Sequence, residues 1–368
     1  MLFQFWPEYA LSGWVDKNYF KCHSIQMNTR LKNYAKTRDV LSYTSTDDLV
    51  KLVLKGMVGQ GWGVNSIIDI EGTKIFAKTI PITKTDLAHM YDTSNIHNLP
   101  VCYNYGVGSA GFGCWRELAF HVKASNWVVG GKCPGFPILY HHRIIESKSI
   151  AAKLKKHKFD KKYFDYWNSD KNIEKFLSCR SNATHFIIMC LEYFPLALYE
   201  ANIDKNINWY HKQMLMILAF LKANKVIHFD AHMGNLITDK KIIILTDFGL
   251  VLDKSFDLSK SEIAFFNKNT NYDKAMMISN MSEPIFEHIF KPATMKKFEK
   301  KYNFDKNTEK EVFENIVFDN LGEICEKFDP SYVRVVKKYR HMIISHNVFM
   351  HNLRRDNTKS VIFPNNAF

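Results

Sequence analysis

The alternation of apolar and polar residues predicts strands in the first half of the chain. Between residues 56 and 82, short apolar runs are separated by a glycine-rich stretch and by the pair Glu71-Gly72. This spacing predicts strand, glycine-rich loop, strand, hairpin turn and strand, with Lys78 on the third strand. The apolar runs 136–144 and 184–194 predict two further strands of the same sheet.

Two segments in this half have helical spacing instead. Ser45 and Asp48 make a capping-box pattern, which predicts a short helix after Ser45. Segment 114–129 follows a polar connection and predicts a longer helix, because apolar residues recur there at i, i+3, i+4 and i+7. These apolar residues are Trp115, Leu118, Ala119 and Val122. Glu117 lies beside the apolar face, where its carboxylate can reach Lys78.

From about residue 195 onward the pattern becomes helical. Segment 208–227 predicts a core helix that leads into His228, and its apolar face consists of Met214, Ile217, Leu218 and Leu221. Ser259 and Glu262 predict another capped helix. Helical periodicity returns at about 294–328 and 330–355. We therefore expect an α+β fold, with a small β-rich part that contains one main helix and a larger, mainly helical part.

The residues that can carry chemistry are concentrated between His228 and Gly249. This stretch contains His-x-Asp-x-x-x-x-Asn, formed by His228, Asp230 and Asn235, then an apolar hairpin, then Asp247-Phe248-Gly249. A carboxylate can orient an attacking hydroxyl, and carboxylate and amide oxygens are the ligands that Mg²⁺ prefers. The hairpin is expected to bring Asn235 and Asp247 to the same side of a cleft.

In order and spacing, this stretch resembles the catalytic and metal-binding loops of the protein-kinase-like phosphotransferases. The glycine-rich loop, Lys78 and Glu117 precede it in the family's order, and the resemblance covers roughly residues 50 to 270. It implies a bilobal kinase-like fold. We expect an extension at 1–45, an N-lobe at 46–194 with a basic insertion at about 145–183, and a helical C-lobe at 195–368.

The resemblance also implies a role for each site residue. Asp230 orients the acceptor hydroxyl, while Asn235 and Asp247 bind Mg²⁺. Lys78, held by Glu117, contacts the α and β phosphates of ATP. The strand at 184–194 corresponds to the one that leads into a kinase hinge, with Leu191 at the gatekeeper position. The remaining nucleotide contacts are implied for the loop glycines and for hinge backbone groups: Gly59, Gly61, Gly63, Glu192, Tyr193 and Phe194.

Several residues depart from the family pattern. Phe229 stands where many protein kinases have the arginine that reads an activation-loop phosphate. His232 replaces a lysine, and Phe76 replaces a small residue that usually covers the adenine. Residues 250–290 contain no Ala-Pro-Glu, and the glycine spacing is G-x-G-x-G rather than G-x-G-x-x-G. We therefore expect either constitutive activity or activation by a ligand, and not activation by loop phosphorylation.

These departures leave more than one function open. The first interpretation is a divergent Ser/Thr protein kinase with a protein substrate, similar to bacterial kinases that act as secreted effectors. The motif around His232 instead resembles small-molecule kinases of the aminoglycoside and choline kinase type. A nucleotide-binding pseudokinase scaffold is a third interpretation. A nucleic-acid-binding module is not indicated, because aromatic residues and lysines form no recognisable recognition motif.

Charge adds one candidate partner site. The 368-residue chain carries a net charge of +13, which indicates attraction to an anionic partner. Six lysines cluster in the insertion: Lys153, Lys155, Lys156, Lys158, Lys161 and Lys162. They form either a solvated helical face or a docking site for a polyanion, such as an inositol polyphosphate or an anionic membrane.

Composition limits the remaining possibilities. The seven cysteines are scattered and never spaced Cys-x-x-Cys, so neither a disulfide framework nor a zinc site is indicated. His341, His346 and His351 lie among apolar residues and are expected to be structural. The N-terminus lacks the features of a standard signal peptide, and no apolar run is long enough to cross a bilayer. We expect a soluble cytoplasmic protein, or one secreted into a host cell without a standard signal.

Overall fold

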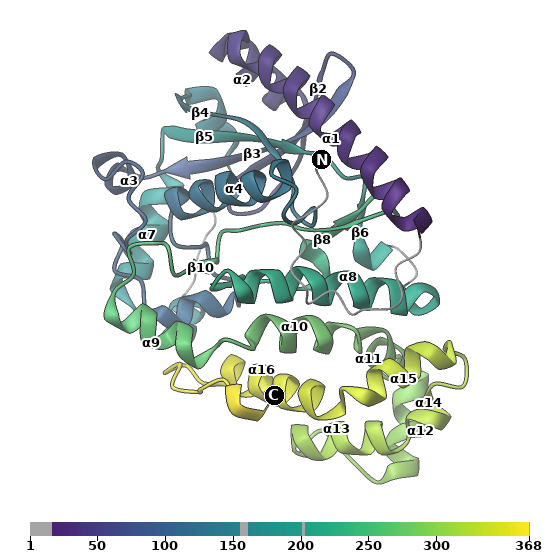
Figure 1. Ribbon diagram of the computed structural model, residues 1–368. Coiled ribbons are helices and arrows are strands. Elements are labelled where there is room, and N and C mark those ends of the chain that lie inside the picture. Colours follow the sequence, from purple (N-terminus) through teal and green to yellow (C-terminus); the bar gives the residue numbers. More distant parts are fainter. Residues whose placement is uncertain (1–16, 155–160, 201–202, 368) are drawn as a thin grey trace. The chain divides into compact units, whose positions relative to one another are not determined.

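The structure is a computed structural model that describes residues 17–154, 161–200 and 203–367. Its fold is α+β, as predicted, with a sheet in the first half of the chain and a mainly helical second half. The chain divides into two compact units (Figure 1). The first comprises Met1–Asp92, Gly113–His157 and Phe176–Phe194; the second comprises Thr93–Phe112, Lys158–Lys175 and Pro195–Phe368. Segments 93–112 and 158–175, which we expected in the N-lobe, thus group with the second unit.

The first unit is built on an antiparallel sheet in the order β1-β2-β3-β5-β4. These strands are β1 (Met57–Gln60), β2 (Val64–Ile70), β3 (Thr73–Ile82), β4 (Leu139–Glu146) and β5 (His185–Glu192). All five were predicted. Glu71 (φ 47°) and Gly72 (φ 80°) form the turn between β2 and β3, and both have the left-handed conformation that a tight hairpin requires.

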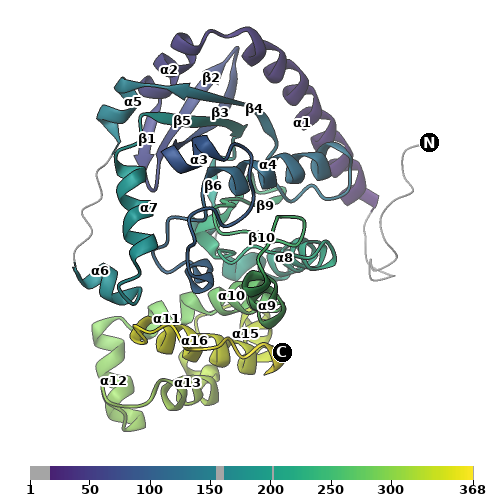
Figure 2. The same cartoon turned by 90° about the vertical axis from the view of Figure 1, so that its left-hand side faces the viewer.

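Helices cover this sheet, as Figure 2 shows from a second side. The first unit contains α1 (Lys17–Tyr43), α2 (Thr46–Lys55), α3 (Lys84–Ala88), α4 (Cys114–Val129) and α5 (Lys148–Lys153), and the chain of α7 (Lys171–Ser181) enters it at Phe176. Helix α1 packs against β2 and β4, and α4 packs against β3 and β4. Ser45 caps α2 as predicted, since its hydroxyl accepts the Asp48 N–H at 3.1 Å.

The predicted bounds of α4 are confirmed, but its predicted buried face is partly wrong. Trp115 and Leu118 are buried, whereas Val122 is 41% exposed. Phe120 and His121, outside the predicted stripe, are buried instead. The helix is buried over most of its circumference, so a single apolar stripe did not define the buried face.

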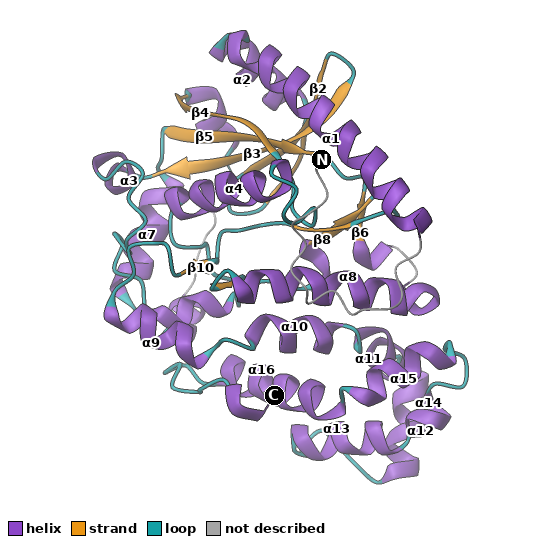
Figure 3. Ribbon diagram, viewed as in Figure 1, coloured by secondary structure: helices purple, strands orange, loops and turns teal. Residues whose placement is uncertain are grey.

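The second unit is mainly helical, as the purple elements of Figure 3 show. Its helices are α6 (Lys161–Tyr166), α8 (Ile203–Ala223), α9 (Lys260–Lys268), α10 (Tyr272–Asn280), α11 (Glu283–Ile289), α12 (Pro292–Tyr302), α13 (Lys310–Asp319), α14 (Leu321–Ile324), α15 (Pro330–Lys338) and α16 (Arg340–Arg355). The four apolar residues predicted on one face of α8 are all buried. The Ser259–Glu262 capping box of α9 is also confirmed.

Two helices of this unit were missed, and both segments predicted as helical, at about 294–328 and 330–355, are divided into shorter helices. Helix α10 is buried on nearly every side, so its sequence shows no amphipathic period. Helix α11 is short and begins with Pro284 in its first turn. The segment predicted as helical at about 294–328 is interrupted after α12, because Asn303 adopts the left-handed conformation (φ 51°) that ends a helix.

Two small antiparallel sheets complete the second unit. One joins β6 (Leu196–Ala197), β8 (Leu236–Thr238) and β9 (Ile243–Leu245); the other joins β7 (Val226–Ile227) and β10 (Leu252–Asp253). Strands β8 and β9 form the predicted hairpin. The residues just before β8 and just after β9 are therefore brought close together. Within the described part of the chain, no helix combines the length and apolar character needed to cross a membrane.

Candidate active site

Strand β3 and helix α4 bring Lys78 and Glu117 together in the first unit. Lys78 Nζ lies 2.6 Å from Glu117 Oε1, and the two side chains are 18% and 8% exposed. This is the ion pair that the sequence led us to expect. His121, one turn further along α4, is buried and places Nε2 3.9 Å from the same carboxylate oxygen. A largely buried lysine and glutamate are stable together because each offsets the charge of the other.

The three loop glycines have different structural requirements. A Cβ at Gly63 would lie 2.1 Å from Thr79 O, so this glycine is needed for β2 to approach β3. A Cβ at Gly59 or Gly61 would meet no other atom within 4 Å. Only Gly63 is therefore explained by packing within the sheet, and the backbone at Gly59 and Gly61 is accessible.

The end of β5 carries the predicted hinge residues. Leu191 pairs with Phe76 across the β3–β5 register. The N–H of Glu192 donates to Ile138 O at 2.9 Å. This narrows our expectation for Glu192, because a backbone N–H used in the protein's own hydrogen bonding cannot also bind adenine. Of the three predicted contact residues, Glu192 retains only its carbonyl as a candidate, and Tyr193 and Phe194 stay candidates.

In the second unit, Asp230 and Asn235 are held together by two hydrogen bonds. The Asn235 side-chain nitrogen Nδ2 donates to Asp230 O at 2.9 Å and to Asp230 Oδ2 at 2.8 Å. His228 accepts the Asp230 N–H at Nδ1 (3.2 Å). Because both bonds of the Asn235 amide use Nδ2, its Oδ1 is the atom suited to bind a cation.

The hairpin places Asp247 next to this loop. Leu236 pairs with Leu245, and the Thr246 N–H donates to Asn235 O at 2.9 Å. Asp247 comes directly after Thr246. Asp247 has a φ of 64°. A left-handed conformation is costly for an aspartate and persists only where surrounding contacts impose it.

A buried carboxylate that we did not predict supports the loop that carries His228 and Asp230. Asp273 accepts the backbone N–H of His228 at 2.7 Å and that of Phe229 at 2.8 Å. Burial raises the pKa of Asp273 to about 7, although these two hydrogen bonds lower it. Its sequence signal was an acidic residue within the apolar run of α10. Asp273 fixes the backbone that leads into the bend at Phe229, which has a φ of 63°.

Phe229 itself lies in an aromatic cluster. It is fully buried, and its ring centroid lies 5.4 Å from Phe265, 5.1 Å from Tyr272 and 6.0 Å from Tyr105. The Tyr105 hydroxyl donates to Asn269 Oδ1 at 3.0 Å. An arginine at this position would bury a charge among aromatic rings.

Segment 106–112 packs against both ends of the motif, which we also did not predict. A Cβ at Gly106 would lie 3.1 Å from Asp230 Oδ1, and a Cβ at Gly111 would lie 2.6 Å from Gly249 O. The Phe112 N–H donates to the same Gly249 oxygen at 3.3 Å. Both glycines have positive φ values, 75° and 82°. We had treated these glycines only as part of a polar connection.

His232 lies beside Asp230, the predicted catalytic carboxylate. Its Nε2 is 3.6 Å from Asp230 Oδ1, and its Nδ1 accepts the Gly234 N–H at 3.0 Å. Burial lowers the pKa of His232, while the charges of Glu283 and Asp247 oppose that shift. The histidine is therefore predominantly neutral near pH 7, unlike the lysine that it replaces.

The remaining candidate residues fall outside this arrangement. Lys153, Lys161 and Lys162 are exposed, whereas Lys155, Lys156 and Lys158 lie outside the described residues. His346 is buried in α16, and burial lowers its pKa to about 3. Among the described residues, no group of three or more His, Cys, Asp or Glu side chains forms a metal site. Asn235 and Asp247 nevertheless suit Mg²⁺ bound with a nucleotide, which needs only one or two protein ligands besides phosphate oxygens and water.

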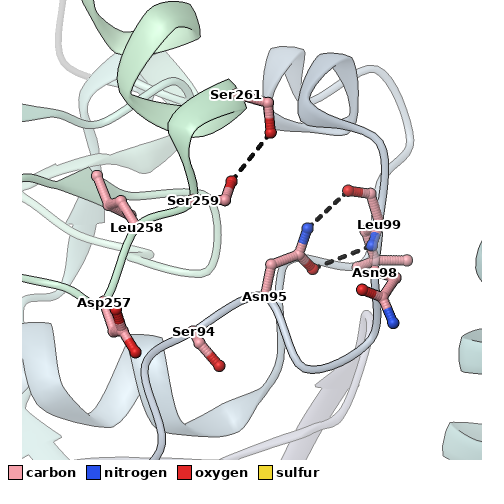
Figure 4. Close-up of a pocket in the computed structure, with 8 residues that line it drawn as sticks. All are labelled: Ser94, Asn95, Asn98, Leu99, Asp257, Leu258, Ser259 and Ser261. Carbon is pink, nitrogen blue, oxygen red and sulfur yellow. Dashed lines mark hydrogen bonds between the residues drawn. The ribbon is translucent and has the colours of Figure 1, made fainter.

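Figure 4 shows a pocket of about 460 Å³ in the second unit. Its lining consists of Ser94, Asn95, Asn98, Leu99, Asp257, Leu258, Ser259 and Ser261. Much of its polar lining is already hydrogen-bonded within the protein. Asn95 Nδ2 donates to Leu99 O at 2.7 Å, and Asn95 Oδ1 accepts the Leu99 N–H at 3.0 Å. Ser259 Oγ lies 2.9 Å from Ser261 Oγ. No residue of the stretch from His228 to Gly249 lines this pocket.

A scan of the sequence against models of known protein families finds no match, and a search of curated proteins finds no significant match.

Proposed function

We propose that this protein is an ATP-dependent phosphotransferase with a bilobal, protein-kinase-like fold. The observation that carries the proposal is the arrangement around the β8–β9 hairpin. There the Asn235 side chain donates a hydrogen bond to Asp230, and the Thr246 N–H donates to Asn235 O. Asp247 is the next residue after Thr246. Such an arrangement supplies a carboxylate for an acceptor hydroxyl and oxygen ligands for a cation bound to phosphate.

The proposed reaction transfers the γ-phosphate of ATP to an alcohol. The acceptor oxygen forms a bond to the γ-phosphorus, the bond to the β–γ bridging oxygen breaks, and ADP leaves. Asn235 already donates to Asp230 Oδ2, so we assign the hydrogen bond from the acceptor hydroxyl to Asp230 Oδ1. Lys78, oriented by Glu117, would bind nucleotide phosphate, and Asn235 and Asp247 would hold Mg²⁺, which would supply positive charge to the phosphate oxygens.

Our preferred acceptor is a Ser or Thr hydroxyl of a protein. Activation-loop phosphorylation is not required in this proposal, because the aromatic cluster around Phe229 fills the place of the phosphate-reading arginine. The catalytic loop is instead fixed by Asp273 and by segment 106–112. A polyanion bound at the lysines of the insertion remains the proposed activator.

His232 supports a second candidate, a kinase of a small cationic alcohol. A largely neutral histidine replaces the lysine charge beside Asp230, and two exposed acidic residues, Glu283 and Glu287, follow on α11. Removing a positive charge beside the catalytic carboxylate favours an acceptor that carries its own positive charge. A peptide acceptor has no such requirement.

One assay separates these functions. The purified protein is incubated with γ-labelled ATP and Mg²⁺ alone, with generic protein substrates, with aminoglycosides and choline, and with inositol hexakisphosphate. Asp247→Ala serves as the control. Label transferred to protein and lost in the variant supports the protein kinase. Label transferred only to a small alcohol supports the second candidate, and nucleotide binding without turnover shows a pseudokinase.

A further inference from the structure

The N-terminal helix α1 reaches the predicted adenine-binding segment through one buried side chain. Arg30, in the middle of α1, is 5% exposed. Its Nε donates to Glu192 Oε1 at 2.8 Å, and its Nη2 donates to Glu192 Oε2 at 2.7 Å. The two groups therefore form a bidentate pair, the arrangement in which a guanidinium binds a carboxylate with most geometric specificity.

Arg30 uses its remaining donors on the backbone that precedes β4. Nη1 donates to Pro134 O at 2.7 Å, and Nη2 donates to Phe136 O at 2.6 Å. Glu192 in turn accepts the Ile138 N–H at 3.2 Å and donates its own N–H to Ile138 O at 2.9 Å. One guanidinium thus joins α1, the 134–138 segment and the end of β5.

This network ends where the predicted adenine contacts begin. Glu192 is the last residue of β5, and Tyr193 and Phe194 follow it. The Arg30 guanidinium carbon lies 5.7 Å from the centre of the Phe194 ring. Arg30 therefore contacts both the first and the third residue of the segment 192–194.

Helix α1 is itself fixed on the sheet, so Arg30 is attached to a rigid element. Arg143 of β4 donates to Thr44 O at 2.6 Å and to Leu41 O at 2.9 Å, at the C-terminal end of α1. Lys36 donates to Glu71 O at 3.0 Å in the β2–β3 turn. A simple extension with no role in the site would not need a buried arginine aimed at the end of β5.

We propose that Arg30 is a positioning residue of the nucleotide site, which fixes the backbone of residues 192–194 for adenine recognition. This inference rests on the proposed function. Arg30 acts through Glu192 and need not touch the nucleotide. Removing it leaves the Glu192 carboxylate buried without its cation, and the strand end must move to hydrate that charge. Adenine affinity should fall, while phosphate affinity depends on Lys78 and is retained.

The test measures the two halves of the nucleotide separately by calorimetry, with adenosine as one probe and Mg²⁺-tripolyphosphate as the other. In Arg30→Met we expect adenosine to bind about tenfold more weakly, the effect of losing one to two hydrogen bonds. Tripolyphosphate should bind within about twofold of wild type. Arg38→Met is the matched control, because Arg38 lies on the same helix but is exposed, and it should change neither affinity.

Arg30→Lys keeps the experiment decisive if Arg30→Met fails to fold. A lysine retains the charge opposite Glu192, but it lacks the planar fork needed to bond Pro134 O and Phe136 O as well. We expect it to weaken adenosine binding by about threefold. Unchanged adenosine affinity in a folded Arg30 variant would overturn the inference, and so would an equal loss for both probes. If wild type binds neither probe, the proposed function fails and the inference fails with it.

Discussion

The two units hold their candidate site residues by different means. In the first unit, two buried ion pairs each join a strand to a helix: Lys78 with Glu117, and Glu192 with Arg30. In the second unit, backbone N–H groups bond the buried Asp273, and glycines allow close packing against Asp230 and Gly249. Charge thus positions groups in one unit, and backbone geometry positions them in the other.

This difference predicts different consequences of mutation. Breaking an ion pair of the first unit leaves one charge buried without its partner, so we expect some loss of stability, with the distinguishing effect on nucleotide affinity. Removing a support of the second unit exposes unbonded backbone groups or creates a steric clash, so we expect losses of stability and turnover. The predictions below test this division, from the largest effect to the smallest.

Asp273→Ala should have the largest effect. It leaves the buried N–H groups of His228 and Phe229 without an acceptor, and two such losses cost on the order of 4 kcal/mol in unfolding free energy. Urea denaturation measures this loss. Asp273→Asn is the matched control, because it keeps an acceptor oxygen and the side-chain shape, and it should lose less. Equal destabilisation by both variants would show that the hydrogen bonds are not what holds the loop.

Gly111→Ala should destabilise the protein by about 2–3 kcal/mol and also slow turnover. Its new Cβ would lie 2.6 Å from Gly249 O, so the backbone that carries Asp247 must shift. Gly72→Ala isolates the conformational cost, since Gly72 has nearly the same φ but a Cβ there meets no atom within 4 Å. We expect the control to lose about 1 kcal/mol and to keep its turnover. If both variants turn over ATP equally, segment 106–112 does not position Gly249.

Glu117→Gln should weaken ATP binding by about tenfold, because the amide no longer provides a charged partner for Lys78. Its unfolding free energy should change less than that of Asp273→Ala. Binding is measured with a fluorescent ATP analogue and stability with urea. A variant that loses stability and keeps its nucleotide affinity would contradict the division between the two units.

The pH dependence of stability should have opposite signs in the two units. Burial raises the pKa of Asp273 from 3.8 to about 7, so the folded state binds this proton more tightly, and the stabilisation present below pH 4 is lost as pH rises toward 7. Burial and Arg143 lower the pKa of His141 from 6.5 to about 4, so its stabilisation is present above pH 6.5 and lost on acidification.

Urea titrations of Asp273→Asn and His141→Gln across this pH range measure each contribution as a difference from wild type. The wild type should lose its advantage over Asp273→Asn as pH rises, and should gain advantage over His141→Gln. Differences of the same sign for both variants would refute this assignment.

Phosphatase treatment should have the smallest effect. Because Phe229 is buried among aromatic rings, the structure gives a loop phosphate no arginine to bind at that position. We expect phosphotransfer activity before and after treatment to agree within about twofold. A large loss of activity would show that phosphorylation regulates the protein through a different residue.

Local patterns predicted the elements of the fold better than the supports of the site. Short apolar runs bounded by turn residues located all five strands of the main sheet, and the spacing of Met214, Ile217, Leu218 and Leu221 identified the buried face of α8. Helix α10 was missed because it is buried on nearly all sides and has no apolar period. Motif spacing found Asp230, Asn235 and Asp247, since these residues lie close together in the sequence.

The supporting residues were missed because their partners are distant in sequence. Arg30 lies 162 residues from Glu192, and Asp273 lies 45 residues from His228. For an arginine in a helix or an aspartate in an apolar run, the neighbouring sequence does not identify the residue that it will contact. The sequence around Gly111 predicts only a polar connection, because its need for a positive φ and close packing appears only in the folded chain.

ATP hydrolysis by the purified protein tests the central claim most directly, because water can replace an unknown acceptor. We measure single-turnover conversion of γ-labelled ATP to ADP, together with the ATP dissociation constant, in wild type and in Asp230→Asn. The account predicts measurable turnover by wild type, slowed by about 10²-fold or more in the variant, with ATP affinity unchanged within about twofold. Equal turnover by both proteins, or ATP binding without any turnover by wild type, would contradict it.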